Sequence, residues 1–263
     1  MIKIYDENNV FVAELKYDET FFSNYSKHSH DMLNLTAIKE GEINIDFHSF
    51  KSEVLKPNEL AVFNPHQVHL SRNISKNALG YYVLYLDVDW CLDIQKNIFE
   101  NLNRFYPIDI NILNSQKIYE DFLDLCNNII KKENVYMELE SFISDIFRKY
   151  AKKEVLKVKN LLSNEIKEYI LNNKNEVRLD DIVSNFSYSK EHIIRVFKKE
   201  FGLSPHAFIV NVKVNKARNK LNNTDNSNLT DIAYDTGFYD QSHFNKNFKK
   251  VYAVSPRTYR PIK

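Results

Sequence analysis

Short strand-like hydrophobic patterns run through the first ninety positions of the chain. The segment 10–17 is strand-like without strict alternation, 33–37 and 43–47 alternate apolar with polar residues, and 81–86 is an apolar run of strand length. Because the two alternating runs flank a tight turn at Glu40-Gly41, we expect them to pair as a β-hairpin. Several short strands, with no long helix before about residue 95, predict an antiparallel barrel or sandwich.

The period of the pattern changes beyond Trp90. Apolar residues then recur at helical spacing over 118–129 and 139–146, with a polar stretch at 131–134 between them. The pattern predicts an antiparallel pair of helices of roughly 15 residues each. Its apolar stripe fits either an internal core seam or a dimer seam, and both alternatives stay open.

These patterns divide the chain into two domains. We expect a first domain over residues 1–155, with a barrel over about 1–90 and a helical part over about 91–155. The lysine-rich segment 150–159 has few large side chains and predicts a linker to a second domain over 161–263. The fold class that follows is α+β, with a β-barrel and helical pair followed by an all-α domain.

One motif occurs twice in the last third of the chain. Phe197-Lys198-Lys199, followed by Ser204-Pro205, recurs 51 residues later as Phe248-Lys249-Lys250, followed by Ser255-Pro256. An upstream segment that begins at Leu179 recurs with an offset of 50 residues at Leu229. A repeat whose length changes only at its turn is typical of a repeated helix-turn-helix.

The repeat predicts two helix-turn-helix units, over about 179–201 and about 229–252, joined by a helix over 208–221. Ser189 and Asp240 precede the second helix of each unit and are the expected N-caps, because their side-chain oxygens accept from unpaired helix N–H groups.

Charge and composition agree with this division. The chain has a formal net charge of +1, but residues 161–263 hold 17 Lys+Arg against 11 Asp+Glu, so basic charge gathers at the repeat, as in nucleic-acid-binding proteins. No signal peptide or membrane-spanning run is evident, and we expect a cytoplasmic protein without membrane contact. Cys91 and Cys126 lack CxxC spacing and predict neither a disulfide framework nor a thiolate metal site.

The C-terminal motifs resemble the AraC/XylS family of bacterial transcription regulators. The most specific matches are Ile232-Ala233, Gly237-Phe238, Gln241-Ser242, Phe244, Phe248-Lys249-Lys250, Ser255-Pro256 and Tyr259-Arg260. A weaker match to the cupin-like sensor domain of that family follows His28-x-His30, Gly41, Pro57, Pro65 and His69. The resemblance implies two helix-turn-helix units joined by a rigid helix, each placing its second helix in a DNA major groove.

The same resemblance implies a sequence-specific transcription regulator and not an enzyme. Its implied partners are promoter or operator DNA, a small-molecule effector in the N-terminal barrel and RNA polymerase. A homodimer is compatible with it, and no cofactor is expected.

Each expected recognition helix has a packing face and an outward face. Ile193 with Phe197, and Phe244 with Phe248, occupy the packing faces at i, i+4 spacing. The outward residues near the base-reading positions of the family are Glu191, Ile194, Arg195, Ser242, His243, Asn245 and Lys246. Arginine and lysine suit guanine, asparagine suits adenine or phosphate, and isoleucine suits a thymine methyl group. Alternatively, several of these residues contact only phosphate or water.

A second group is predicted to contact the DNA backbone. It comprises Lys190, Lys198, Lys199, Gln241, Lys249, Lys250 and Arg257. Phosphate anchoring by these residues predicts affinity that falls steeply with salt. The alternative is that the lysines are solvated helix ends that stabilise the helix dipole.

Three positions depart from the glycines expected at turns. Ser187 stands where the family usually has a turn glycine, Ala253 stands where the first copy has Gly202, and Asn58 replaces a frequent glycine. If these turns need positive φ, each non-glycine residue costs about 1 kcal/mol. We therefore expect locally altered turns at Ser187 and Ala253, whereas asparagine tolerates positive φ better.

The histidines of the first domain raise the question of a metal. Cupin enzymes hold one through a His-x-His pair, a nearby Glu and a later His, and His66 or His69 could complete the pair here. Asn34 and Leu35 occupy the expected places of the acid, so we expect no metal. The family resemblance makes the barrel an effector pocket with contacts from His28, His30, His69, Tyr82 and Tyr85. The alternative for any one histidine is a surface position at a strand end.

We therefore expect a ligand-responsive regulator with two readers, which are the two helix-turn-helix units. An effector bound in residues 1 to about 90 would change how these readers meet adjacent major grooves. Two alternatives stay open. One is a metal-dependent cupin enzyme with a vestigial helical domain, and the other is a ligand-independent regulator whose N-terminal domain only dimerises.

Overall fold

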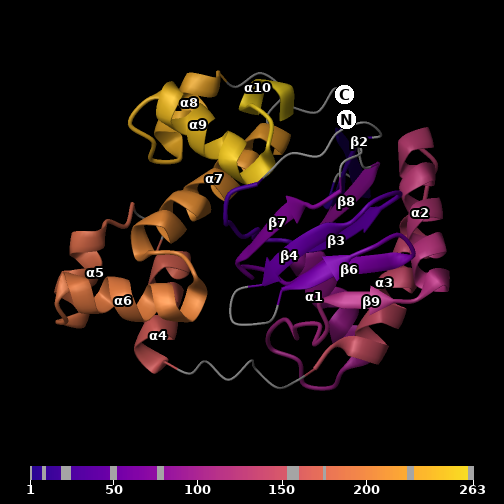
Figure 1. Cartoon of the computed structure of the whole chain (residues 1–263), viewed down its shortest axis with the longest axis horizontal. Helices are drawn as coiled ribbons and strands as arrows, with labels where there is room; N and C mark the ends of the chain where they lie inside the picture. Colours follow the sequence, from indigo (N-terminus) through magenta and orange to yellow (C-terminus); the bar gives the residue numbers. More distant parts are fainter. Residues whose placement is uncertain are drawn as a thin grey trace.

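The computed structural model of the chain has a β-rich part beside an array of helices (Figure 1). It describes residues 2–7, 10–18, 25–47, 52–75, 80–152, 160–173, 176–223 and 228–259. Arg260 of the C-terminal motif and residues 153–159 of the expected linker lie outside the described residues. None of the helices within these ranges combines the length and the apolar character needed to cross a membrane.

The larger sheet of the described residues has six strands, in the order β1-β2-β8-β3-β6-β9. They are β1 (Ile2–Glu7), β2 (Val10–Asp18), β8 (Tyr81–Leu86), β3 (Leu33–Ile38), β6 (Glu59–Phe63) and β9 (Ile112–Asn114). The strands predicted at 10–17 and 81–86 are confirmed as β2 and β8, which pair antiparallel. All six residues of β8 are buried, so both faces of this sheet are covered.

The smaller sheet has the order β5-β4-β7, with β5 (Glu53–Leu55), β4 (Ile43–Phe47) and β7 (His69–Asn73). The predicted hairpin is wrong, because β3 pairs with β6 and β8 whereas β4 pairs with β5 and β7. The chain passes from one sheet to the other near Gly41, whose φ is 74°. Alternation identifies the buried face of a strand but does not identify its neighbour.

Helices α1, α2 and α3 cover one face of the larger sheet. They are α1 (Val88–Ile98), α2 (Gln116–Lys131) and α3 (Tyr136–Tyr150), and Figure 1 shows α2 and α3 along the side away from the C-terminal helices. The predicted stripe is buried with Leu35 and Leu84 of the sheet in one cluster, so it is an internal core seam. Two details were not predicted: α1 begins at Val88, before residue 95, and β9 lies inside the expected helical part.

The described residues of the C-terminal part form seven helices. They are α4 (Leu161–Asn172), α5 (Leu179–Phe186), α6 (Lys190–Phe201), α7 (Pro205–Asn223), α8 (Leu229–Asp235), α9 (Gln241–Tyr252) and α10 (Pro256–Tyr259). The predicted N-caps are confirmed: Ser189 accepts from the amide of His192, and Asp240 accepts from the amide of His243. Each helix-turn-helix therefore begins its second helix at the expected residue.

The expected alteration of two turns is wrong. Ser187 and Ala253 both keep the left-handed conformation, with φ of 55° and 63°, as do Gly202 and Gly237 at the equivalent positions of the other copy. The backbone therefore retains the turn geometry of glycine and carries the steric cost of a side chain. Asn58 also has positive φ, at 69°.

The two helix-turn-helix units belong to different cores. The first unit has its own cluster, which contains Ile193 and Phe197 of α6. In contrast, Phe244 and Phe248 of α9 belong to a cluster that also contains Val83 and Tyr85 of the barrel. The second unit is thus packed against the β-rich part, whereas the first is not part of that core.

Candidate sensor cavity and DNA interface

A cavity of about 40 Å³ lies inside the barrel between the two sheets. Its lining includes apolar residues of both sheets and a polar group formed by His28, His30, Asn34, Thr36, His69 and Tyr85. Four predicted effector contacts, the three histidines and Tyr85, are thus brought together. Tyr82 is not among the lining residues, and its prediction as a contact is corrected. Since side chains alternate along a strand, Tyr82 lies on the helix-covered face of the sheet, stacked with Tyr17.

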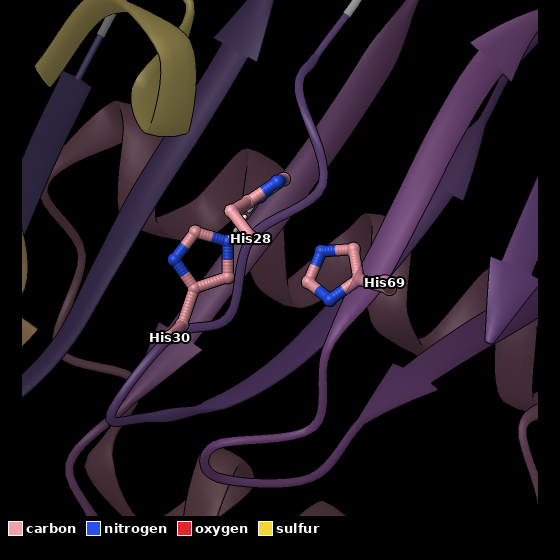
Figure 2. A group of neighbouring side chains, drawn as sticks. All are labelled: His28, His30 and His69. Carbon is pink, nitrogen blue, oxygen red and sulfur yellow. Dashed lines mark hydrogen bonds between the residues drawn. The ribbon is translucent and has the colours of Figure 1, made fainter. Parts of the chain in front are cut away.

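The three histidines line this cavity, and Figure 2 shows them as neighbours. His28 and His30 lie on the segment that leads into β3, and His69 begins β7; a β-bridge joins residues 28 and 69. All three are 3% exposed, so they are not surface groups at strand ends. One ring nitrogen from each lies within 4.8 Å of the others.

Hydrogen bonds fix how the rings are protonated. The Nδ1–H of His28 donates to the carbonyl of Ser26 at 2.6 Å, and the Nδ1–H of His69 donates to the carbonyl of Gln67 at 3.0 Å. Burial lowers the pKa of His69 to about 4 and lowers the pKa values of His28 and His30 well below the usual range. All three rings are therefore neutral at pH 7, and Nε2 of His28 and of His69 carries a lone pair.

The residue between the first two histidines bonds to the C-terminal helical part. The backbone N–H of Ser29 donates to Oδ1 of Asn211 at 3.0 Å, and its carbonyl accepts from Asn211 at 2.6 Å and from Asn215 at 3.2 Å. Both asparagines lie on α7 and are at most 4% exposed. The cavity wall and the helix that joins the two readers thus share a buried polar contact, which the sequence analysis did not identify.

A buried ion pair fastens the same two parts. Arg218 of α7 and Glu14 of β2 are 1% and 0% exposed, with Nη2 2.6 Å from Oε2. The hydroxyl of Tyr259 and the amide of Asn222 also donate to the Glu14 carboxylate. Burial disfavours the charged guanidinium, but Glu14, Tyr259, Tyr252 and Asp31 together outweigh it, and the pKa of Arg218 is raised well above its ordinary value. Sequence alone gave no signal for this pair, because its members lie 204 positions apart.

The C-terminal end of α9 also contacts the barrel. Lys16 of β2 is 3% exposed and donates from Nζ to the carbonyl of Tyr252 at 2.7 Å. The ring of Tyr252 lies 5.3 Å from that of His30, centroid to centroid, and its hydroxyl donates to Asn215. The second reader is therefore in direct contact with the histidine cluster.

A second cavity of about 320 Å³ lies where the barrel meets α7. Its lining is polar, with Asp31, Asp87, Asp89, Arg218, Asn219 and Asn222 around Met32 and Val88. Burial raises the pKa of Asp87. Because both parts of the chain line this cavity, an occupant there would contact both.

The predicted base-reading residues of α6 lie on the face of the helix opposite its buried residues. Glu191 and Arg195 are exposed and Ile194 is half-buried, while Ile193 and Phe197 are buried as expected. Arg195 is 3.2 Å from Nδ1 of His192, which is stacked on Tyr188. The guanidinium is thus held beside the surface of α6.

The predicted residues of α9 are similarly placed. Ser242, His243 and Lys246 are exposed. Asn245 is half-buried, and its Oδ1 has no hydrogen-bond partner among the described residues. This acceptor is therefore enclosed in the chain as it stands, and a base contact from Asn245 would require its side chain to turn outward.

Most predicted backbone contacts are exposed. They are Lys190, Lys198, Lys199, Lys249, Lys250 and Arg257. Gln241 is the exception, because it is half-buried and accepts from Thr230 of α8. Lys190 forms an exposed ion pair with Asp180 at 3.3 Å, which a phosphate would replace.

Two tyrosines beside the recognition helices were missed. Tyr239 is 86% exposed and Tyr188 is 48% exposed, and each directly precedes an N-cap residue. The signal was present in the repeat, because both occupy the same place in their copies. An exposed aromatic ring with a hydroxyl at a helix N-terminus is suited to contact sugar and phosphate.

Comparisons with known families match both halves of the chain. The model of a family described as AraC-like ligand binding domain matches residues 13–144, and the model of a family described as helix-turn-helix domain matches residues 182–261.

Similar curated proteins are transcription regulators. The chain is 36% identical over 99 residues to the HTH-type transcriptional regulator MtrA of Neisseria gonorrhoeae, covering 38% of this chain and 33% of MtrA. It is 24% identical over 229 residues to the uncharacterized HTH-type transcriptional regulator YbfI of Bacillus subtilis, covering 83% of this chain and 81% of YbfI. The chain thus spans about a third of the first relative and most of the second.

Solved structures of ToxT from Vibrio cholerae share the fold. A single-substitution variant of ToxT in its apo form superposes with a TM-score of 0.63 at 15% identity, covering 97% of this chain and 98% of ToxT. Wild-type ToxT with a bound unsaturated fatty acid gives a TM-score of 0.60 at 16% identity, covering 97% and 96%. At this identity the similarity concerns the two-domain fold alone.

Proposed function

Because the chain belongs to the AraC family of DNA-binding transcription regulators, a non-enzymatic family, we propose that the occupant of its barrel controls how its two readers meet DNA. The family includes an N-terminal ligand-binding domain and a helix-turn-helix domain. The identity of the ligand and the residues that transmit its effect belong to the proposal.

The readers are α6 and α9, which enter successive major grooves. The connecting helix α7 has 19 residues and is therefore about 28 Å long at 1.5 Å per residue. This length is close to the roughly 34 Å of one DNA turn that separates successive major grooves. Base edges are contacted by the outward residues of the two helices, and the exposed lysines beside them bind phosphate.

The contact of Ser29 with Asn211 and Asn215 carries the proposal. It joins the segment that holds His28 and His30 directly to α7, so displacement of that segment moves the helix between the readers. Because the second reader shares a core with the barrel, it moves together with the barrel. The first reader has a core of its own and can move separately. An occupant of the cavity would thus change the angle between the readers.

The cavity volume limits what the barrel accepts as it stands. Sites for drug-sized ligands hold about 300–1,000 Å³, against about 40 Å³ here. An unsaturated fatty acid, such as the one bound in the ToxT structure, would require the lining side chains to move apart, whereas an ion or a few water molecules fit directly. RNA polymerase and a second copy of the chain remain proposed partners.

The experiment begins with selection of binding sites from random duplex DNA by the full chain. We expect the selected site to bind at least 1,000-fold more tightly than scrambled DNA at matched salt. The double substitution Asn211→Ala and Asn215→Ala should then raise affinity for the selected site at least 5-fold, because α7 is freed from the docked arrangement. Asn127→Ala, at an exposed position of α2, is the control.

Fluorescence anisotropy of labelled duplexes measures both quantities. Equal affinity for selected and scrambled DNA contradicts sequence-specific regulation. Unchanged or lower affinity of the double variant contradicts control through the Ser29 contact.

A further inference from the structure

The histidine cluster has the features of a metal site without its metal-binding acid. We propose that the sensor barrel binds one divalent transition-metal ion of the zinc class through a ring nitrogen of each of His28, His30 and His69. This ion would be a ligand of the regulator and serves no catalytic reaction. The inference extends the proposed function, but metal binding itself can be measured without DNA.

The first argument is the support of the rings. Histidines that bind metals usually donate their other N–H to a carbonyl or carboxylate, which fixes the tautomer and the ring orientation. His28 and His69 both do so, through Nδ1 to Ser26 and Gln67, and therefore keep Nε2 unprotonated, with a lone pair that a metal can bind. Two backbone carbonyls thus fix the tautomers of two histidines that line the same cavity.

The second argument is the unusual contact of the remaining ring. Nε2 of His30 lies 3.0 Å from Nε2 of His28. Because His28 must accept in this hydrogen bond, His30 carries its proton on Nε2, and its buried Nδ1 has no partner among the described residues. A buried polar atom without a partner is costly. A metal bound at Nε2 would replace the contact between the two nitrogens and shift the proton of His30 from Nε2 to Nδ1, which would then require an acceptor.

The third argument is space and geometry. Ligand nitrogens in a tetrahedral zinc site are about 3.3 Å apart, given metal–nitrogen distances of about 2.0–2.1 Å. The three nitrogens here lie within 4.8 Å of one another, so the rings shown in Figure 2 would have to turn toward their common centre to reach that range. A cavity of about 40 Å³ holds an ion and one water molecule.

The ligand set selects the class of ion. Three neutral imidazoles suit zinc, nickel, copper or iron, whereas calcium and magnesium require oxygen ligands. The converging group among the described residues contains no carboxylate, and Asn34 lines the cavity with its Oδ1 accepting from Thr36. The fourth coordination position is therefore open to water or to an anionic ligand.

The site also reaches the second reader. The ring of His30 contacts Tyr252 at the end of α9, and Ser29 between the two histidine ligands bonds to α7. Metal binding pulls His28 and His30 toward His69 and changes the protonated nitrogen of His30. Both changes occur at residues that touch the DNA-binding helices.

The test uses the full chain, stripped of metal with a chelator and titrated with Zn²⁺ by calorimetry. We expect one ion per chain, a higher thermal midpoint with metal, and with Co²⁺ the visible absorption of a tetrahedral site. His28→Ala and His69→Ala should each weaken binding at least 100-fold, and His69→Gln provides a variant of similar size. The control is His206→Ala, at an exposed position of α7, which should bind as the wild type does.

Circular dichroism and the thermal midpoint of each metal-free variant show whether it folds. Absence of one-to-one binding by the folded wild type overturns the proposal, as does binding that persists in folded His28→Ala and His69→Gln chains. Zn²⁺ should also change affinity for the selected DNA at least 5-fold in the wild type and not in His69→Gln. Metal binding without this change overturns the regulatory part, whereas loss of specific DNA binding with and without metal overturns the proposed function instead.

Discussion

At the scale of single residues, two turns keep a geometry that their side chains oppose. Ser187 ends α5 and Ala253 ends α9 in the left-handed region, where the other copy of each turn has glycine. The hydrogen bonds that close these helix ends are made, since the amide of Ser187 donates to Val183 and that of Ala253 to Lys249. The surrounding fold therefore imposes the turn, and local preference yields to it.

We expect Ser187→Gly and Ala253→Gly each to stabilise the chain by about 0.5–1 kcal/mol. Removal of the β-carbon relieves roughly 1–2 kcal/mol of left-handed strain, and the greater freedom of glycine in the unfolded chain offsets part of it. Urea unfolding followed by circular dichroism measures the change. Gly202→Ala is the matched control and should destabilise, since Gly202 has φ of 77°; a loss of stability in both glycine variants would refute the strain argument.

At the scale of elements, the two recognition helices share a design but differ in surroundings. Each has an N-cap with an exposed tyrosine before it, an aromatic or aliphatic packing face, and a lysine pair near its end. Their outward residues differ, with Glu191 and Ile194 in α6 against Ser242 and Asn245 in α9. The two helices are therefore expected to read different half-sites.

Lys246→Ala and Lys249→Ala should separate base reading from anchoring. Loss of a base contact at Lys246 should cost about 1–3 kcal/mol and relax preference at one base pair. Loss of a phosphate contact at Lys249 should weaken all sequences alike and reduce the slope of log affinity against log salt by about 1. Anisotropy titrations at several salt concentrations, with single-base variants of the selected site, distinguish them. If both variants show the same salt dependence and the same base preference, Lys246 and Lys249 do not differ in role.

At the scale of the whole molecule, the barrel and the second helix-turn-helix unit share one buried core. The Glu14–Arg218 pair lies at its centre, with Tyr259 of α10 on the same carboxylate. A buried pair of this kind adds little over a well-packed apolar pair, but loss of one partner leaves a charge uncompensated. We therefore expect the pair to specify how the two parts dock more than to stabilise them.

Arg218→Ala should weaken the docking by about 3–5 kcal/mol. We expect the wild type to unfold in one calorimetric transition and the variant in two, because the barrel and the helices lose their shared core contact. Arg148→Ala, on the exposed face of α3, should change stability by less than about 1 kcal/mol. A single unshifted transition in the Arg218 variant would show that the pair does not join the two parts.

The sequence by itself determined the local elements and the two helix-turn-helix units. Hydrophobic periodicity and helix caps depend on residues a few positions apart, so they predicted β2, β8, α2, α3 and the start of α6 and α9. The repeat supported the two helix-turn-helix units. They also separated the buried Phe244 and Phe248 from the exposed Lys246, because helical geometry fixes which residues share a face.

Only the tertiary structure decided which elements lie together. It placed β3 and β4 in different sheets, turned Tyr82 away from the cavity that Tyr85 lines, and joined Glu14 to Arg218 across 204 positions. It also showed the three histidines converging without the expected acid. Strand neighbours and buried polar partners depend on contacts between segments far apart in the sequence. Local hydrophobic patterns do not show which distant segments will be in contact.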